Sequence, residues 1–329
     1  MDLLTPSARP ARATVSVVVP VHDEEEVLPE FQRRLAAVLD ALDCDAEVVY
    51  VNDGSTDGSL ALLAGFHRDD PRVGVIDLSR NFGKEIAMTA GLDAASGDAV
   101  IVIDADLQDP PECMPEMVAA WRSGSEIILM RRRNRDQEGF LKRSTAKAFY
   151  RVIGRMSTIA IPEDVGDFRL LSRRAVDALQ RFPERSRFMK GLFAWIGFQS
   201  REIEYDRDRR FAGKTKWNYW RLWNFALEGI TSFSAAPLKI ASYIGFSTAL
   251  VAFIYGTYVI GKTLLFGNPV PGYPSLVTLI LFLGGLQLMA LGIIGEYLAR
   301  MFIEVKQRPL YLVQQHLAPR RTGTNDRDS

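Results

Sequence analysis

Three aspartates directly follow an apolar run in the stretch VIVIDADLQDPPE, residues 100–112. Asp104 and Asp106 stand two residues apart, at the point where a buried strand is expected to end. Side chains at this spacing point to the same side of an extended chain, so both carboxylates can converge on one cation. Carboxylate oxygens suit Mg²⁺ or Mn²⁺, with phosphate oxygens completing the coordination. The alternative is a solvated turn, which is the more frequent origin of an acid pair in an arbitrary loop.

The pattern around these acids places them at the end of a strand. From residue 15 to about residue 130, apolar runs of strand length alternate with helical patterns. The alternation predicts βαβ units, and therefore an α/β fold with a mostly parallel, Rossmann-like sheet and helices on both faces. Polar clusters follow the first four apolar runs, namely HDEE, NDGSTDGS, SRNFGKE and DADLQD. Ligands of such sheets bind beyond the carboxyl ends of the strands, so these clusters are expected to meet at one site.

Asp53 lies in the second of these clusters. Its carboxylate can accept hydrogen bonds from a base or a ribose, while Gly54 allows the backbone to turn sharply. The alternative is an Asx turn or a helix cap, which is the better interpretation for Asp57.

The composition excludes some classes of function. The 329 residues include 40 Lys and Arg residues and 40 Asp and Glu residues, so a globally basic nucleic-acid binder is not indicated. Cys44 and Cys113 fit no metal-ligand or disulfide spacing, and we expect two reduced thiols.

Two apolar segments without a charge, residues 240–260 and 275–295, lie in the C-terminal third. Each is long enough to cross the roughly 30 Å of a bilayer's hydrocarbon core. A buried hairpin in a soluble protein is the weaker alternative, because its helices usually keep a polar face and these segments have none. Lys and Arg residues are concentrated before the first segment and after the second, so the positive-inside rule puts both termini in the cytoplasm.

Eight segments of the chain together resemble one known family: PVHDEE, VNDGSTDGS, RNFGKE, DADLQDPPE, VGDFRLLSR, PERSRFMKG, AGKTKWNYWRLWNFALEGITSFS and GYPSLVTLILFLGGLQLMALGIIGEYLAR. From about Val15 to about Leu312 the chain resembles the polyisoprenyl-phosphate glycosyltransferases of glycosyltransferase family 2, which have the GT-A fold. The likeness is greatest to bacterial bactoprenol (undecaprenyl-phosphate) glucosyltransferases. Residues 165–234 are more specific evidence for this resemblance than the aspartate pair is.

The resemblance implies a role for each matching residue. Asp104 and Asp106 match the metal-binding pair, which implies Mg²⁺ or Mn²⁺ as the cofactor. The residues expected to contact the nucleotide sugar are Pro20, Asp23, Glu25, Asp53, Lys84, Asp104, Gln108, Arg210 and Lys216. The residues expected to bind the phosphate of the acceptor lipid are Arg132, Lys142, Arg143 and Arg169.

Asp167, in VGDFR, is expected to face the acceptor and, with Asp106, to be catalytic. A phosphate monoester near pH 7 carries a charge of roughly −1.5 to −2, so its oxygen attacks without a strong base. Asp167 is therefore expected to act as a base or as an orienting group, and an ion pair with Arg169 is the structural alternative. Arg210 and Lys216 can instead contact lipid headgroups, and Lys84 can be a surface residue at the start of a helix.

The implied activity is an inverting, metal-dependent transfer of glucose from UDP-glucose to undecaprenyl phosphate, for modification of a cell-envelope glycan. The implied location is the bacterial inner membrane, crossed more than once, and the implied assembly is a homo-oligomer, a tetramer by resemblance. Two alternatives stay open: another donor, such as a UDP-amino sugar or GDP-mannose, and a non-catalytic nucleotide-binding scaffold or translocase. A processive polysaccharide synthase is not expected, because the chain lacks a Gln-x-x-Arg-Trp motif and further membrane segments.

Basic and aromatic residues precede the first apolar segment and indicate helices in the membrane interface. A solvated helix face is the alternative for the basic residues. The predicted layout is a flexible N-terminus (1–13), a cytoplasmic GT-A catalytic domain (14–215), an amphipathic juxtamembrane helix (216–236), a transmembrane helix (237–262), a short external loop (263–273), a second transmembrane helix (274–299) and a cytoplasmic C-terminal tail (300–329) whose polar end is expected to be disordered.

Overall fold

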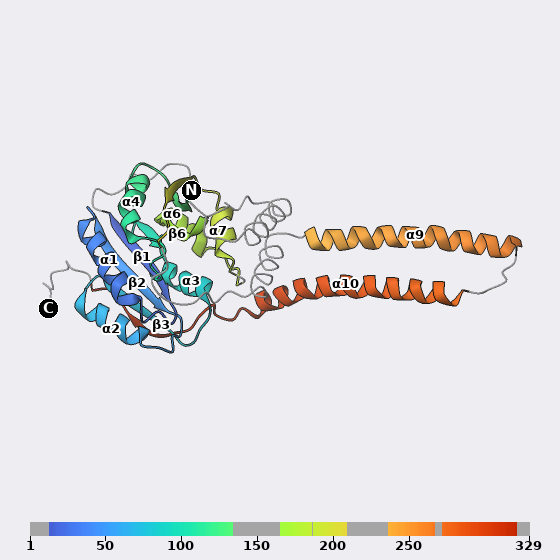
Figure 1. Ribbon diagram of the computed structural model, residues 1–329, viewed down its shortest axis with the longest axis horizontal. Coiled ribbons are helices and arrows are strands. Elements are labelled where there is room, and N and C mark those ends of the chain that lie inside the picture. Colours follow the sequence, from blue (N-terminus) through green and yellow to red (C-terminus); the bar gives the residue numbers. More distant parts are fainter. Residues whose placement is uncertain (1–12, 134–164, 186, 209–235, 267–271, 321–329) are drawn as a thin grey trace. The chain divides into compact units, whose positions relative to one another are not determined.

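The computed structural model describes residues 13–133, 165–185, 187–208, 236–266 and 272–320. The chain divides into two compact units. The first comprises Met1–Tyr150, Ile159–Tyr219 and Pro309–Ser329 and contains a β-sheet with its covering helices (Figure 1). The second comprises Arg151–Thr158 and Trp220–Arg308 and contains two long helices.

Eight strands of the described residues form one mixed sheet. They are β1 (Thr14–Val21), β2 (Asp45–Asn52), β3 (Val73–Leu78), β4 (Ala99–Val102), β5 (Ile127–Arg132), β6 (Val165–Ser172), β7 (Ser200–Tyr205) and β8 (Val313–Leu317). Their order across the sheet is β7-β5-β6-β4-β1-β2-β3-β8. Strands β1 to β4 are mutually parallel, as predicted, whereas β6 and β8 run antiparallel to their neighbours.

The helices of this unit connect the strands. They are α1 (Leu28–Ala41), α2 (Ser59–Asp69), α3 (Lys84–Ala94), a 3₁₀ turn η1 (Pro111–Cys113), α4 (Met114–Arg122), α6 (Arg173–Gln180) and α7 (Met189–Trp195).

Strand β1 is buried on both faces, as in other parallel sheets covered by helices on two sides. Val15 and Val17 belong to the apolar cluster that also contains Phe31 of α1. Val18 points the opposite way and lies against Gly91 of α3. The predicted α/β class, with helices on both faces of a mostly parallel sheet, is therefore confirmed.

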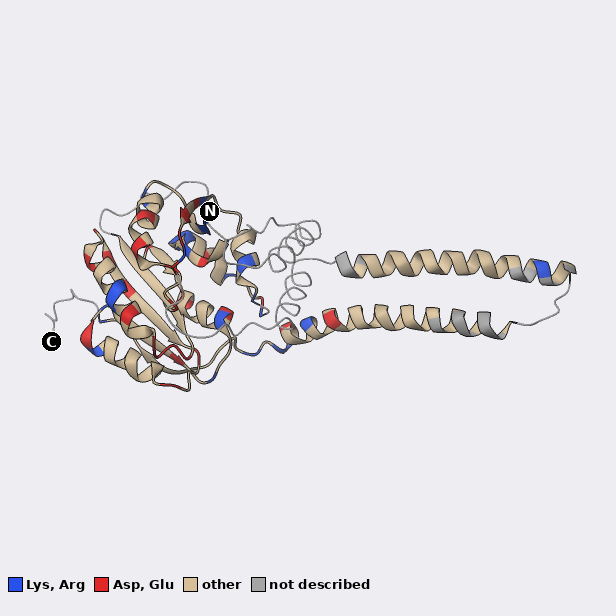
Figure 2. Cartoon of the chain, in the orientation of Figure 1, with Lys and Arg blue, Asp and Glu red and all other residues tan. Residues whose placement is uncertain are grey.

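Helices α9 (Ala236–Phe266) and α10 (Tyr273–Lys306) contact each other in the second unit. Within them, Ile240–Tyr258 and Phe282–Lys306 are long and apolar enough to cross a membrane, and neither stretch is buried by other residues of the described chain. Figure 2 shows long uncharged stretches along both helices. Exposed apolar surface of this extent is unfavourable in water, so a lipid environment suits these helices.

The structure differs from the predicted layout after the second apolar helix. Helix α10 continues to Lys306, beyond the predicted end at residue 299, and Val313–Leu317 join the sheet as β8. The sequence VQQHL does not alternate between apolar and polar residues, and four of its five side chains are exposed. Its place in the sheet depends on backbone pairing with the edge of β3, which a hydrophobic pattern cannot reveal.

The close approach of α3 to β1 requires a glycine. A Cβ atom on Gly91 would lie 2.2 Å from Val18 Cγ1 and 3.2 Å from Val51 Cγ2. We expect Gly91→Ala to lower the free energy of unfolding by about 1–3 kcal/mol, because the added methyl group overpacks this contact.

Gly65→Ala in α2 is the matched control. The nearest atom to its new methyl group is the end of the Arg68 side chain at 3.9 Å, so alanine should raise stability by up to about 1 kcal/mol. Thermal unfolding of the full chain in detergent measures both variants. An unchanged unfolding midpoint for Gly91→Ala would contradict this account of the packing.

Candidate active site

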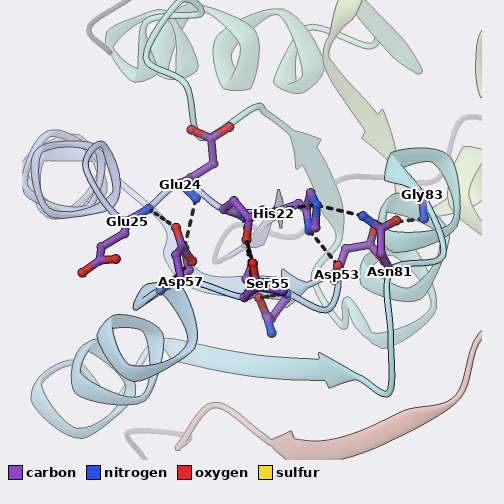
Figure 3. A network of polar contacts seen from close by, with 12 residues as sticks. His22, Glu24, Glu25, Asp53, Ser55, Asp57, Asn81 and Gly83 are labelled. Atoms are coloured by element: carbon purple, nitrogen blue, oxygen red, sulfur yellow. Dashed lines mark hydrogen bonds and ion pairs between the residues drawn. The ribbon is translucent and has the colours of Figure 1, made fainter. Parts of the chain in front are cut away.

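The carboxyl ends of β1, β2 and β4 lie at one edge of the sheet, because these strands are parallel neighbours. The segments that follow them contain His22, Asp53 and Asp104. Figure 3 shows that the segments after β1 and β2 are joined by hydrogen bonds to the loop before α3. The polar clusters of the sequence therefore meet at one edge.

His22 and Asp53 hold the loop before α3. His22 Nδ1 donates to the backbone carbonyl of Asp53 at 2.9 Å, so Nε2 accepts from the side-chain amide of Asn81, also at 2.9 Å. The carboxylate of Asp53 accepts the backbone N–H groups of Phe82 at 2.7 Å and of Gly83 at 2.9 Å (Figure 3). Asp53 thus supports this loop, while its contact with a nucleotide remains a prediction.

Asp23 and Glu25 hold the turn that leads into α2. Asp23 accepts the backbone N–H group of Thr56 and Glu25 accepts that of Gly58, both at 2.8 Å. Asp57 accepts the N–H group of Glu25 at 3.1 Å through Oδ2 and that of Ser59, the first residue of α2, at 3.0 Å through Oδ1. The Asx-turn interpretation of Asp57 is confirmed. Asp23 and Glu25 themselves lie between β1 and α1.

Lys84, the first residue of α3, joins two carboxylates from different parts of the sheet. Its Nζ lies 2.7 Å from both carboxylate oxygens of Asp104, which follows β4, and 2.5 Å from Oδ2 of Asp167 in β6. The carboxylates meet because β4 and β6 are antiparallel neighbours. Lys84 therefore faces both carboxylates, while its side chain stays partly exposed at the start of α3. The Lys84 side chain is 43% exposed, those of Asp104 and Asp167 only 26% and 13%.

The charges of this group shift one another's pKa values. Burial raises the pKa of Asp104 to about 6, and the Lys84 ammonium counteracts the rise. Burial also opposes ionisation of Asp167, but the nearby cations, first Lys84 and then Lys190 and Arg169, hold the pKa of Asp167 well below its usual range. Burial opposes the charge on Lys84 too, yet its two carboxylate partners raise its pKa. Near neutral pH the group is therefore one ammonium between two carboxylates.

Arg169 supports the backbone beside Asp167 and does not pair with its carboxylate. Its buried guanidinium donates to the carbonyl oxygen of Gly166 at 2.6 Å and to that of Asp167 at 3.3 Å, and it stacks on the ring of Phe193 at 3.9 Å. Burial lowers the pKa of Arg169 to about 10. The structural alternative of an Asp167–Arg169 ion pair is therefore wrong, and the contact of Arg169 with an acceptor phosphate stays a prediction.

Arg132, the last residue of β5, lies beside Gly166 of β6. Its Nη2 would be 3.2 Å from a Cβ atom placed on Gly166. Burial opposes its charge, but a hydrogen bond to Tyr205 and the carboxylate of Asp109 raise the pKa of Arg132. Tyr205 in turn donates a short hydrogen bond to Asp109. Asp109, the third aspartate of the opening stretch, thus belongs to the surroundings of Arg132.

Two buried polar atoms of this region lack a hydrogen-bond partner among the described residues: Nε of Arg132 and Oδ1 of Asp167. One is a donor and the other an acceptor. Unpaired buried polar atoms are rare and costly, so they mark a place where a ligand can complete the hydrogen bonding.

The turn after Asp106 is held by contacts from distant parts of the chain. Asp106 accepts the backbone N–H group of Gln108 at 3.1 Å, and the carbonyl of Gln108 accepts that of Asp208 at 3.1 Å. Arg34 of α1 pairs with Glu112 at 2.6 Å and with Asp208 at 3.2 Å. Arg34 carries no local sign of this role in the sequence, because it is one of two adjacent arginines within a helix.

Lys190 and Glu85 also belong to the site, although the sequence did not assign them a role. Glu85 of α3 accepts the backbone N–H group of Met189 at 3.3 Å, and burial raises the pKa of Glu85 to about 7. Burial lowers the pKa of Lys190 in α7, while the Asp167 carboxylate opposes that change. The segment PERSRFMKG supported the family resemblance, but no pattern in it reveals that α7 lies near Asp167.

The remaining predicted residues are only partly placed. Pro20 lies in β1, in register with Val51 of β2. Lys142, Arg143, Arg210 and Lys216 lie outside the described residues.

The acid pair fits a divalent cation that is bound together with a ligand. Asp104 and Asp106 offer carboxylate oxygens, which Mg²⁺ and Mn²⁺ prefer. In the part of the chain that the structure describes, no group of three or more His, Cys, Asp or Glu side chains could hold a metal. Two aspartates leave coordination positions for phosphate oxygens and water.

We expect Lys84→Met to destabilise the protein mainly near neutral pH. In the wild type the depressed pKa of Asp167 contributes stability that is present above its unfolded pKa and lost as the pH falls. Without the ammonium the pKa values of both carboxylates rise, and groups with raised folded pKa values lose their contribution as the pH increases.

The unfolding midpoint of Lys84→Met should therefore fall further below that of the wild type at about pH 7.5 than at about pH 5, roughly twofold further. Lys84→Arg keeps the charge and is the control. An equal loss at both pH values would show that Lys84 does not balance these acids.

Comparison with known proteins identifies the family of the chain. The family described as "Glycosyl transferase family 2" matches residues 16–180, and "GtrB C-terminal hairpin" matches residues 236–301. An uncharacterized glycosyltransferase of Synechocystis is 52% identical over 91% of this chain and 94% of its own length. The SfII prophage-derived bactoprenol glucosyl transferase of Shigella flexneri is 48% identical over 92% of this chain and 97% of its own.

A solved structure resembles the chain more distantly. The mannosyltransferase PcManGT from Pyrobaculum calidifontis, in complex with GDP-Man and Mn²⁺, has a TM-score of 0.47 at 16% identity, over 85% of this chain and 87% of that chain. The family match over the sheet, the hairpin match over α9 and α10, and relatives about half identical over nearly the whole chain lead to one conclusion. The chain is a glycosyltransferase of family 2, with the GT-A fold and a GtrB-type C-terminal hairpin.

Proposed function

We propose that this enzyme transfers glucose from UDP-glucose to undecaprenyl phosphate, with inversion at the anomeric carbon. The observation that carries the proposal is the position of Arg132 beside Gly166, the residue before Asp167 in β6. Arg132 and Asp167 each have a buried atom that lacks a partner among the described residues. Lys84 links Asp167 to Asp104, and so to the acid pair. The name of the Shigella flexneri relative, a bactoprenol glucosyl transferase, supports this choice of sugar and acceptor.

The charge of the acceptor explains the roles proposed for Arg132 and Asp167. A phosphate monoester carries a charge of roughly −1.5 to −2 near pH 7, so it needs a cation more than it needs a base. The Nε–H group of Arg132 can donate a charge-assisted hydrogen bond to it. Asp167 is a weak base because its pKa is depressed. We therefore assign Asp167 to orienting a hydroxyl group or the acceptor, and not to removing a proton.

The donor is proposed to bind at the edge formed by β1, β2 and β4. Asp104 and Asp106 would hold Mg²⁺ or Mn²⁺, which when bound neutralises the charge that builds on the departing diphosphate. Lys84 keeps Asp104 oriented at this position. Residues proposed to contact the nucleotide sugar are Pro20, Asp23, Glu25, Asp53 and Gln108, with Arg210 and Lys216 closing over the diphosphate.

The membrane supplies the acceptor. We place α9 and α10 across the bacterial inner membrane, with both termini and the catalytic unit in the cytoplasm, because basic residues flank the hairpin on that side. We also propose that the protein forms a homo-oligomer, a tetramer by resemblance. Its product would be used to modify a cell-envelope glycan.

We expect the purified full-length protein to transfer radiolabelled glucose from UDP-glucose to undecaprenyl phosphate only when Mg²⁺ or Mn²⁺ is present. Asp106→Ala should lower the rate by about 100-fold or more, because the diphosphate loses its charge partner. Asp69→Ala, which removes an exposed acid at the end of α2, should leave the rate unchanged.

Each other result of this assay has a definite meaning. UDP-glucose that binds without transfer, together with transfer from a UDP-amino sugar or GDP-mannose, would correct the donor. Binding without transfer from any donor would favour the non-catalytic scaffold.

We expect Arg132→Gln to raise the KM for the lipid phosphate by about tenfold or more, since a charged hydrogen bond contributes about 1.5–3 kcal/mol. The KM for UDP-glucose should change less than about twofold, because Arg132 is assigned to the acceptor alone. Arg131→Gln is the neighbouring control, since Arg131 forms an exposed ion pair with Glu202 at 3.0 Å. Equal effects of the two substitutions on the acceptor KM would refute the role of Arg132.

A further inference from the structure

The segment after the second long helix is attached to the active-site unit at several points. β8 pairs with β3, in the register Val75 with Leu317 and Leu78 with Val313. Just before β8, the carbonyl of Leu312 accepts the backbone N–H group of Ser79 at 2.9 Å. The Tyr311 hydroxyl donates to Asp93, in the last turn of α3, at 3.0 Å.

These contacts enclose the part of the chain that carries Lys84. Ser79 is the first residue after β3, and the loop from Ser79 to Gly83 leads directly into α3, whose first residue is Lys84. The Leu312 bond therefore holds the start of this loop, and the Tyr311 bond holds the far end of the helix.

The loop between these two points has little room to move. A Cβ atom on Gly54, whose φ is +62°, would lie 2.4 Å from the backbone of Arg80 and Asn81. The Asp53 carboxylate holds the next two backbone N–H groups, those of Phe82 and Gly83. Lys84 is the first residue of α3, so a shift of the helix moves Lys84 directly.

We propose that Tyr311 is a positioning residue for the active site, which fixes the orientation of α3 and thereby keeps the Lys84 ammonium between Asp104 and Asp167. An α-helix is stiff over the 11 residues of α3, so its two ends move together. A displacement of about 1 Å at a catalytic group lowers rates by up to about 100-fold. The residues directly after the membrane hairpin are therefore part of the support of the catalytic centre.

The same segment offers a matched control. Arg320 donates to the carbonyl oxygens of His67 at 2.9 Å and Arg68 at 2.8 Å, at the end of α2. It thus anchors the same segment to the same unit, but through a helix that carries no residue of the Lys84 group. A general loss of anchoring should affect both variants, whereas positioning of Lys84 should depend on Tyr311 alone.

The test compares Tyr311→Phe and Arg320→Ala in the full-length protein by hydrogen–deuterium exchange and by steady-state transfer from UDP-glucose. Tyr311→Phe should speed exchange of the backbone amides of α3 (Lys84–Ala94) by about tenfold, and Arg320→Ala should leave them unchanged. In the transfer assay, Tyr311→Phe should lower kcat by about five- to tenfold with less than about a twofold change in the KM for UDP-glucose.

A double-mutant cycle shows whether the effect passes through Lys84. In the Lys84→Met background, Tyr311→Phe should change kcat by less than about twofold, because there is no ammonium left to position. An equal loss of kcat in both backgrounds, or unchanged exchange in α3, would overturn the proposal. Only the kinetic arm rests on the proposed function: if the wild type does not use UDP-glucose, that function fails while the exchange result still decides the role of Tyr311.

Discussion

The candidate active site depends on one ammonium group shared by two carboxylates. Asp104 and Asp167 come from neighbouring antiparallel strands, and their mutual repulsion at a half-buried sheet edge would be strong without a cation between them. Lys84 supplies that cation from the first residue of α3. The position of α3 therefore sets the electrostatics of the site. Two residues help to fix this position of α3. Gly91 allows the helix to lie directly on β1, and Asp53 holds the loop that precedes the helix.

The balance of charge also separates the roles of the acids. Asp104 lies next to Asp106, where a divalent cation with its phosphate ligand would add positive charge that Lys84 alone does not supply. Asp167 is not assigned to the metal, and the cations around it keep it ionised. An aspartate with a depressed pKa is a better orienting group than a base. A phosphate acceptor, already nucleophilic, requires nothing stronger. The electrostatics of the site and the proposed reaction are thus consistent.

Much of the fold was predictable because β1 to β4 are buried strands with polar residues at their carboxyl ends. The acid pair, Lys84 and Asp167 were predicted as site residues in this way or through the family resemblance. What the sequence could not reveal depends on contacts between distant residues. The pairing of β8 uses the backbone, and the partner of Asp167 proved to be Lys84 and not Arg169. Arg34, which pairs with Glu112 and Asp208, and Lys190, whose charge acts on Asp167, lie in helices with no distinguishing pattern.

The most direct measurement is a cryo-electron microscopy structure of the full-length protein with UDP and Mn²⁺. Our account predicts metal density beside Asp104 and Asp106, in contact with the diphosphate, while the Lys84 ammonium still contacts Asp167. A diphosphate bound away from the acid pair would contradict it. So would a Lys84 side chain turned away from both carboxylates.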